Sequence, residues 1–452
     1  MTDFRAASPY KLAAVACTAV ILAVVSAVVY LGTAHHQAAA ANRGPHAAGG
    51  PRGTAAASQA RLAAAGLDPP RDFPDGTGIA VGSADAVVND GLAYSFYGSD
   101  TEAGSADGDQ VPTVDAIALG SGNDRWQRPL PELTFPLTGP NLPPLAVTAA
   151  PGGGQLVYYA GIVLIEGTGT QADQLKLEVG ALDPQTGAPS WVTQVNLSSE
   201  LLDTEESLIG DVDAGIIGAD PDYLVVEVNG SDEAPATFVL SATSHALSWT
   251  ASAFQPSGLA GDVVVGMTVA DSFSDTGTPE GLNVRTGEVT WTDSSLDVST
   301  DGESAVVSPS IVTFESYGLV SDETYLLSTS NGAVLKTLPD MYTCMYDQVS
   351  VVACYSDGIN GASLIGFDAT SLRQLWELPN PAGTRIAPEL HAAYKGLLYT
   401  EADNGDVILN ARTGADEVDN VPIAPDLVVP GYGLVRDDSD GDNTLFAYPA
   451  TR

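Results

Sequence analysis

Basic side chains are scarce in this 452-residue chain. Lys and Arg number 17 against 57 Asp and Glu, which gives a formal net charge of −40. Nucleic-acid binding requires clustered Lys and Arg that neutralise phosphates, so the composition argues against it. Such a charge also disfavours close approach to anionic lipid headgroups. We expect partners that are cations, neutral glycans or basic protein surfaces, and acidic side chains that keep the protein hydrated and monomeric.

Histidine is also rare. Of five copies, only His245 and His391 lie beyond residue 46. A Ser-His-Asp site needs a histidine next to its nucleophile, and two isolated histidines do not supply one. The glycine-rich stretches at residues 120–122 and 152–154 lie between strands and open no helix that could cradle a phosphate. The sequence therefore predicts a protein that is not an enzyme.

One long apolar run lies near the N-terminus. Residues 12–31 contain no charged side chain and could cross about 30 Å of hydrocarbon as a helix. The apolar core of a cleavable signal spans about 7–15 residues, so this longer run favours a retained signal-anchor. We expect residues 1–11 to be cytoplasmic, residues 12–31 to span the cell membrane once as a signal-anchor helix, and the residues after 31 to be extracytoplasmic. A cleaved signal is the alternative, favoured by the small residues at 38–41.

The segment after this run is rich in Ala, Gly and Pro and has no apolar periodicity. We interpret residues 32–77 as a disordered linker. From residue 78 to residue 452 the chain alternates short runs of Val, Ile, Leu, Tyr and Thr with Gly, Asn and Asp, and no amphipathic helix interrupts it. The second part is therefore expected to be an all-β domain.

All five tryptophans occupy one position of a repeat. In residues 180–191 (GALDPQTGAPSW) a strand ends at Asp183, a Thr-Gly turn follows, and Trp comes eight residues after the aspartate. Residues 281–291 (GLNVRTGEVTW) keep the same interval. Self-similarity at a fixed period indicates a repeat architecture. The repeat tryptophans are Trp126, Trp191, Trp249, Trp291 and Trp376, the first of them after a turn that is one residue shorter.

The turn position that corresponds to Asp183 recurs eight times. A four-stranded blade of a β-propeller takes about 40–45 residues, and most separations match that length. The two longer early separations are best explained by loop insertions, which include residues 129–144. We predict a single propeller of about eight four-stranded blades, with seven as the alternative. The predicted turn positions are Leu119, Asp183, Ser241, Asn283, Ser328, Asp368, Asn410 and Tyr448.

The last repeat lacks its fourth strand, because the chain stops where the Thr-Gly turn should begin. A ring that kept this gap would expose the hydrogen-bonding groups of a strand edge. Residues near 75–84 are available to supply the missing strand. We therefore expect the N-terminal end of the domain to close the ring.

The unit at residues 181–191, with further copies at 282–291 and 367–376, resembles the repeat of the quinoprotein-type, PQQ-like β-propellers. The resemblance covers roughly residues 78–452 and implies that each repeat Trp packs between neighbouring blades. This family includes PQQ-dependent dehydrogenases, which carry a vicinal Cys-Cys disulfide and a calcium-bound carboxylate. It also includes cofactor-free propellers of the bacterial cell envelope. Because this chain has no Cys-Cys pair, the resemblance implies a cofactor-free envelope member that does not bind PQQ.

Two cysteines lie in the predicted extracytoplasmic part. Cys344 and Cys354 form an even pair in an oxidising location, which favours a disulfide. A two-residue turn at Asp347 and Gln348 would instead place Cys344 opposite Val351. The disulfide therefore requires a longer loop or a bulge.

One acidic segment is a candidate for calcium. Residues 437–443 (DDSDGDN) contain alternating aspartates, Asp438, Asp440 and Asp442, and short loops use such spacing to bring oxygen ligands together. The spacing departs from the EF-hand pattern and no Glu follows at its twelfth position. An acidic hairpin tip in water is the default interpretation, and a calcium site is the alternative.

These features together predict a membrane-anchored, extracytoplasmic β-propeller that acts as a scaffold. We expect it to bind envelope proteins, a cell-wall component or another ligand through its loops, especially residues 100–110 and 129–144. A PQQ-dependent dehydrogenase or another propeller enzyme is the alternative. A third hypothesis is that the ring serves only as a structural spacer in the envelope.

Overall fold

The computed structural model describes residues 69–73, 78–83, 86–97, 111–133, 144–171, 173–197, 212–230, 234–270, 274–300, 304–317, 322–358, 361–437 and 444–451. The predicted anchor at residues 12–31 and most of the predicted linker lie outside these ranges. Within them, every regular element is a strand, and no helix is long and apolar enough to cross a membrane.

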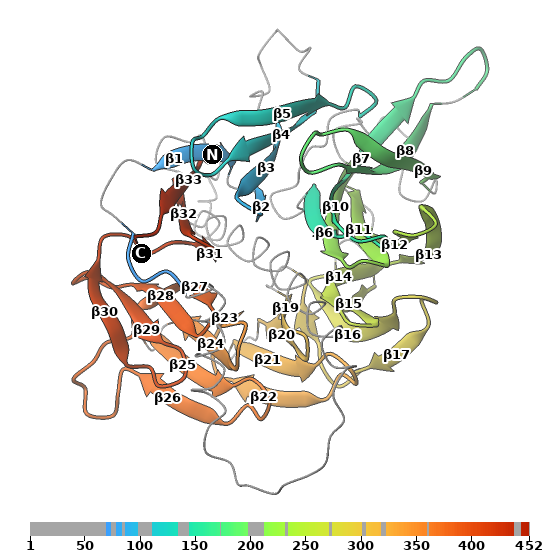
Figure 1. Cartoon of the computed structure of the whole chain (residues 1–452). Helices are drawn as coiled ribbons and strands as arrows, with labels where there is room; N and C mark the ends of the chain where they lie inside the picture. The colour runs from blue at the N-terminus through green and yellow to red at the C-terminus, as the bar shows by residue number, and fades with distance from the viewer. Residues whose placement is uncertain are drawn as a thin grey trace, which may run out of the picture.

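Thirty-two of the described strands form eight four-stranded antiparallel sheets, arranged as blades around a central axis (Figure 1). The innermost strands of successive blades contact one another from β2 round to β31. This arrangement confirms the predicted all-β propeller and its eight blades, and excludes the alternative with seven.

The first four blades take up the N-terminal half of the ring. Blade 1 consists of β2 (Val87–Asn89), β3 (Leu92–Tyr97), β4 (Thr113–Ala118) and β5 (Asp124–Pro129); blade 2 of β6 (Leu145–Ala149), β7 (Gln155–Ile165), β8 (Gln174–Leu182) and β9 (Pro189–Asn196); blade 3 of β10 (Val212–Ala219), β11 (Tyr223–Gly230), β12 (Ala236–Ser241) and β13 (Ala246–Ser252); blade 4 of β14 (Phe254–Ala260), β15 (Val263–Val269), β16 (Thr276–Asn283) and β17 (Val289–Thr292). A short additional strand, β18 (Val298–Ser299), also pairs with β16.

The other four blades complete the ring. Blade 5 consists of β19 (Ala305–Ser308), β20 (Ile311–Ser316), β21 (Glu323–Ser328) and β22 (Val334–Leu338); blade 6 of β23 (Thr343–Tyr346), β24 (Val351–Ser356), β25 (Ser363–Asp368) and β26 (Gln374–Leu378); blade 7 of β27 (Glu389–Tyr394), β28 (Leu397–Glu401), β29 (Asp406–Asn410) and β30 (Asp416–Val421); blade 8 of β31 (Leu427–Val429), β32 (Tyr432–Asp437), β33 (Thr444–Pro449) and β1 (Ile79–Ser83).

Blade 8 joins the two ends of the domain. Its outer strand β1 pairs with β33, with Ile79 opposite Ala447, and β1 also contacts β3 and β4 of blade 1. The prediction that residues near 75–84 supply the missing strand is confirmed. Pairing with β1 thus covers the edge of β33, and blade 8 gains the fourth, outer strand that the other blades have.

The turn at the outer end of blade 8 is assembled from two distant segments. Asp72 accepts hydrogen bonds from the backbone N–H of Thr451, at 3.0 Å, and from its hydroxyl. Phe73 is fully buried against the ring of Tyr399 in blade 7, with the ring centroids 6.1 Å apart. The Tyr399 hydroxyl donates to the carbonyl of Pro70 at 2.7 Å. Residues 69–73 therefore act as a strap across blades 7 and 8.

The core lies between blades, because each sheet is covered on both faces by its neighbours. Middle strands are buried along most of their length, as in β12, whereas the outer strand β5 buries only Trp126. Apolar clusters accordingly span adjacent blades, and one of them joins Tyr158 of blade 2 to Phe238 of blade 3.

Two predicted turn positions are wrong by one residue. The N–H of Gly122 donates to the carbonyl of Ala118, and this bond matches the one from Gly187 to Asp183. Ala118, not Leu119, is therefore the equivalent position, and Trp126 comes eight residues after it without a shortened turn. In blade 8 Pro449, not Tyr448, lies opposite the first residue of β32. Apolar residues occupy both positions, so no polar side chain marked the register.

Candidate functional site

The ring has two faces that differ in the length of their connections. Connections between the first and second strands of a blade, and between the third and fourth, leave from one face, here called the turn face. The longest of them covers residues 183–188. The connections between second and third strands, and those between blades, leave from the opposite face, here called the loop face. They include residues 98–112, 130–144 and 197–211.

These three long connections are acidic in sequence. Together they contain ten Asp and Glu residues and neither Lys nor Arg. The strands that they join, β3 to β4, β5 to β6 and β9 to β10, all end at the loop face of blades 1–3. The ten acidic residues therefore belong to connections that begin and end on one side of the loop face.

The predicted partner loops fall largely outside the described residues. Of residues 100–110 none is described, and of residues 129–144 only 129–133 and 144 are. Leu130 and Leu133 are buried, and a Cβ on Gly161 would lie 3.0 Å from a Leu133 methyl carbon. The start of the second segment thus packs against blade 2.

The calcium candidates Asp438, Asp440 and Asp442 also lie outside the described residues. Their neighbours Asp437 and Thr444 face each other at the ends of β32 and β33 on the loop face. Within the described ranges, no group of three or more His, Cys, Asp or Glu side chains could hold a metal ion.

The repeat tryptophans lie on the outer strands and reach the next blade. Trp126 donates its indole N–H to the carbonyl of Pro184 at 2.9 Å and packs on Gly187. A Cβ at that glycine would lie 2.5 Å from the ring, and its φ of +66° also favours glycine. The same pair of contacts recurs at Trp249, Trp291 and Trp376, whose N–H groups donate to Val284, Thr329 and Ala411.

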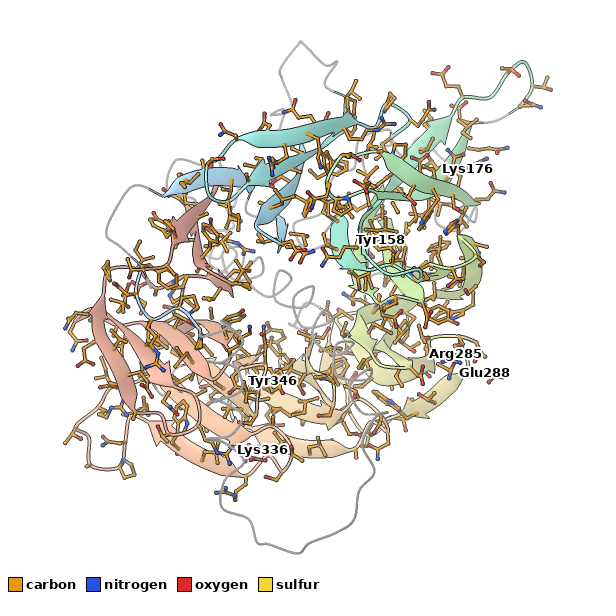
Figure 2. The ribbon with its side chains drawn as sticks, in the orientation of Figure 1. Tyr158, Lys176, Arg285, Glu288, Lys336 and Tyr346 are labelled. Carbon is orange, nitrogen blue, oxygen red and sulfur yellow. A yellow bond between two sulfur atoms is a disulfide. The ribbon has the colours of Figure 1, made fainter. Side chains whose placement is uncertain are left out.

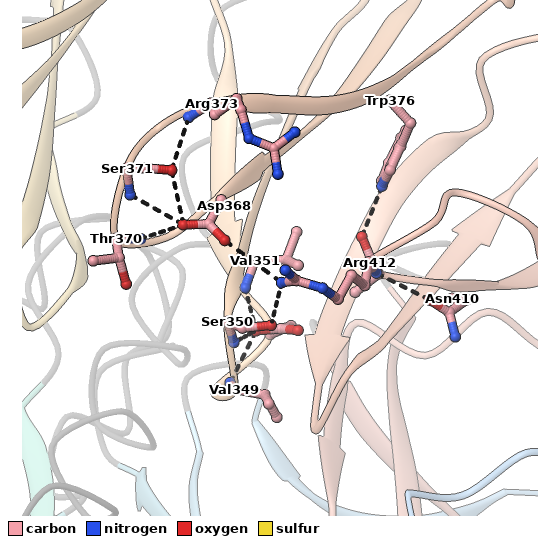
Figure 3. A network of polar contacts seen from close by, with 12 residues as sticks. Val349, Ser350, Val351, Asp368, Thr370, Ser371, Arg373, Trp376, Asn410 and Arg412 are labelled. Atoms are coloured by element: carbon pink, nitrogen blue, oxygen red, sulfur yellow. Dashed lines mark hydrogen bonds and ion pairs between the residues drawn. The ribbon is translucent and has the colours of Figure 1, made fainter. Parts of the chain in front are cut away.

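Blades 6 and 7 show how a turn completes this contact (Figure 3). Asp368 accepts hydrogen bonds from the backbone N–H groups of Thr370 and Ser371, which fixes its turn. Arg412 of the next blade lies 3.5 Å from the Asp368 carboxylate and 3.3 Å from the Ser350 hydroxyl. At this position, polar groups of the turn face thus help to hold blades 6 and 7 together.

Trp191 departs from the pattern. His245 takes the place of the turn glycine in blade 3, and its ring stacks on the indole with centroids 4.7 Å apart. Neither the Trp191 N–H nor the buried Tyr158 hydroxyl has a hydrogen-bond partner among the described residues. In blade 1 the equivalent Tyr94 and Trp126 both donate to Pro184.

Blade 5 has lysine at the tryptophan position. Figure 2 shows Tyr158 towards the inside of the ring and Lys336 on the outer strand β22. The Lys336 ammonium lies 4.9 Å from the ring centroid of Phe367 in blade 6. A cation over an aromatic face thus takes the place of the indole contact there.

Cys344 and Cys354 form a disulfide. They lie directly opposite each other on β23 and β24. The connecting loop is longer than the two-residue turn considered from the sequence, because Asp347 bonds to Val351 and its carboxylate accepts N–H groups from Val349, Ser350 and Val351. This loop brings the two cysteines into register.

Three of the five buried carboxyl groups in the described part of the chain lie on middle strands of blades 1–3. Glu227 on β11 is fully enclosed, and burial raises its pKa to about 8 against the opposing hydrogen bond from Asn229. Burial also raises the pKa of Asp115 to about 6, although Gln127 donates to it. Glu178 accepts hydrogen bonds from Tyr159 and Gln194. These groups lie between blades and not in an open site.

His391 is a further titratable group, at the loop face between blades 7 and 8, and no sequence pattern marks it as a site residue. His391 Nδ1 lies 2.9 Å from Asp426 Oδ1, and its Nε2 lies 3.3 Å from Glu401 Oε2. Asp426 is 35 residues from His391, so only the ring brings them together. Two carboxylates thus flank one imidazole: Asp426 hydrogen-bonds to Nδ1, whereas Glu401 lies at ion-pair distance from Nε2 without forming a hydrogen bond. This arrangement favours a protonated ring.

No family model matches the chain, and no curated protein matches it. The solved structures that resemble it include BamB from Moraxella catarrhalis, at 18% identity over 79% of this chain and 97% of that chain, with a TM-score of 0.39. A europium-containing methanol dehydrogenase shows 11% identity over 81% of each chain and a TM-score of 0.41. The quinohemoprotein alcohol dehydrogenase from Comamonas testosteroni shows 11% identity over 86% of this chain and 77% of that chain, with a TM-score of 0.44. At these values the similarities carry no argument about function.

Proposed function

We propose that this protein is a membrane-anchored binding scaffold of the bacterial cell envelope, whose loop face recruits a protein or cell-wall component. The observation that carries the proposal is the difference between the two faces. The turn face has only short connections, whose polar groups bond within their own turns or, like Arg412, to the neighbouring blade. The long connections all leave from the loop face, where a rigid ring can present variable segments to a partner.

Charge indicates the kind of partner. The three long connections contain ten acidic and no basic residues, so a basic protein surface or a neutral glycan is favoured over an anionic ligand. Attraction of this kind is screened by salt, with a Debye length of about 8 Å at physiological ionic strength. Binding is therefore expected to weaken as salt rises.

Crosslinking in the native membrane tests the scaffold. The anchored protein would be crosslinked, purified and its captured partners identified, with a parallel variant that joins β3 directly to β4. Tyr97 and Thr113 are paired, so an Asn-Gly turn can replace residues 98–112 without disturbing the strands. We expect a reproducible partner that this variant loses.

The matched control changes the turn face. Arg285 and Asp262 form an exposed ion pair there, and replacing both with Asn and Ser should leave capture unchanged. Equal capture by the loop variant would contradict the proposal. So would recovery of no partner together with a cofactor that co-purifies with the ring and reduces a dye in the presence of Ca²⁺.

The anchored location is part of the same proposal. Residues 12–31 would hold the chain in the membrane with the propeller outside the cytoplasm. Alkaline extraction should leave the intact chain in the membrane, and external protease should reach the ring after the outer layers are opened. Release of a shorter chain into the soluble fraction would instead indicate a cleaved signal.

A further inference from the structure

His391 occupies a bulge on the innermost strand of blade 7. The β27–β28 pairing places Leu390 opposite Thr400 and Ala392 opposite Tyr399, which leaves His391 as the extra residue between them. A bulge of this kind redirects a side chain out of the regular alternation. At this bulge the imidazole of His391 contacts Asp426, which lies in the connection to blade 8.

Blade 4 has the same bulge with a different pair. Ser257 lies between Pro256 and Gly258, which face Gly266 and Val265, and its hydroxyl bonds to that of Ser304 at 2.8 Å. Ser304 directly precedes β19 of blade 5, just as Asp426 directly precedes β31 of blade 8. Blades 7 and 8 are therefore joined at the position where blades 4 and 5 are joined, but by an ionisable histidine and aspartate in place of two serine hydroxyls.

Asp426 holds the connection to blade 8 in place. Its second carboxylate oxygen accepts the backbone N–H of Arg436 at 2.8 Å, and its own N–H donates to Leu434. Asp406 of β29 accepts a hydrogen bond from the backbone of Ala424 in the same connection. Residues 422–426 are thus fixed to blade 8 by Asp426 and to blade 7 by His391 and Asp406.

The groups around the imidazole are mostly anionic. They are Asp426 from the connection, Glu389 from β27 itself, Glu401 from β28 and Asp406 from β29. On the far side of Asp426, its second oxygen accepts the backbone N–H of Arg436 on β32. With His391 neutral, four carboxyl groups crowd this part of the loop face. A protonated imidazole places a positive charge between Asp426 and Glu401. It also donates a charge-assisted hydrogen bond to Asp426.

We propose that His391 is a proton-operated clasp between blades 7 and 8. Protonated, it holds residues 422–426 against blade 7; neutral, it loosens this connection and the adjoining part of the loop face. The clasp is a property of the ring and does not depend on the scaffold role.

The direction of the pH effect follows from the surroundings of the imidazole. Burial lowers the pKa of His391, but the hydrogen bond and charge of Asp426, together with Glu389 and Glu401, raise it above the ordinary value of 6.5 overall. The stabilisation from the charged imidazole is therefore complete below pH 6.5 and disappears as the pH rises through the folded-state pKa. The clasp closes in acid and opens in alkali.

Hydrogen exchange of the intact protein tests the clasp. The protection of the amides at residues 424–436 would be compared at pH 5.5 and pH 9, with labelling times adjusted for the intrinsic pH dependence of exchange. Because charge-assisted hydrogen bonds are about twice as strong as neutral ones, we expect protection to fall roughly five- to tenfold at the higher pH. The amides at residues 304–308, next to Ser304, provide the reference within the same molecule.

Two variants separate the clasp from a general pH effect. H391Q should abolish the pH dependence at residues 424–436, as should the paired variant H391S with D426S, which copies the hydroxyl contact of blades 4 and 5. An unchanged response in H391Q, or equal loss of protection at residues 304–308 in the natural protein, would overturn the proposal. So would protection at 424–436 that stays constant between the two pH values in the natural protein.

Discussion

The rings of Trp191 and His245 stack with their planes 13° apart and their centroids separated by 4.7 Å. The other four repeat tryptophans each pack on a turn glycine of the next blade. Each also donates its indole N–H to the carbonyl one residue after the turn position of that blade. His245 has a left-handed φ of 55° in this turn, and the carbonyl of Ala242 does not receive the indole N–H. The imidazole thus replaces a hydrogen bond with a ring contact.

Replacing His245 with glycine should stabilise the ring. The substitution removes the cost of a left-handed non-glycine residue, of order 1 kcal/mol, and clears the path from Trp191 to the Ala242 carbonyl. We expect H245G to raise the free energy of unfolding by about 1 kcal/mol and to alter tryptophan emission. Denaturant unfolding followed by fluorescence measures both.

Asp90 provides the matched control, because it has a left-handed φ of 47° in the turn between β2 and β3 but is exposed and is not at a tryptophan contact position. D90G should give the backbone gain without the change in emission. A destabilised H245G would mean that the stacked rings outweigh the strain.

The blade count and the closing strand followed from the sequence because both depend on local spacing. Tryptophan intervals and turn residues repeat along the chain, and the missing fourth strand of the last repeat required a donor. The first and last turn positions were wrong by one residue because Ala118 and Pro449 provide no polar marker there.

The seam between blades 7 and 8 could not be predicted in the same way. His391 is an isolated histidine in an apolar strand, and the bulge that redirects it is a feature of strand pairing. Its partner Asp426 lies in a different blade and becomes a neighbour only through the ring. Residues 69–73 posed the same difficulty, since nothing in their composition indicates that Pro70 bonds to Tyr399 of blade 7 or that Asp72 completes a turn of blade 8.

Glu227 should make stability depend on pH. The folded protein keeps this carboxyl protonated up to about pH 8, whereas the unfolded chain ionises it near pH 4.5. The folded state therefore binds the extra proton between these values, and stability falls as the pH rises through this window, by roughly 1.4 kcal/mol per unit of pKa difference. E227Q should flatten that decline and melt at a higher temperature than the natural protein at pH 9.

Glu288 is the control, since it lies exposed in the turn between β16 and β17. E288Q should leave the pH profile of the melting temperature unchanged. If E227Q followed the natural profile from pH 5 to pH 9, Glu227 would have to be ionised or hydrated in the folded state.

The strap at residues 69–73 should be essential for ring closure. Phe73 is fully buried, and a Cβ on Gly433 would lie 2.7 Å from its ring. Truncating a buried Phe costs about 3–5 kcal/mol, so F73A should sharply lower the melting temperature and increase hydrogen exchange in β1 and β33. R71A is the control, because its ion pair with Glu417 is exposed and contributes about 0–1 kcal/mol. Similar losses in both variants would refute a specific role of the aromatic anchor.

The disulfide should stabilise blade 6 modestly. Cys344 and Cys354 are ten residues apart, and closing so short a loop in the unfolded chain contributes about 2–3 kcal/mol. Cys354 is fully buried and Cys344 nearly so, so a mild reductant should reach them only after the hairpin opens. We expect the double variant C344A/C354A to unfold at a lower denaturant concentration than the oxidised protein, and reductant to have no further effect on it. If the oxidised protein and its fully reduced form had the same unfolding midpoint, the prediction would be wrong. The unfolded chain would then already keep the two cysteines close together, so that the bond removes no entropy from it.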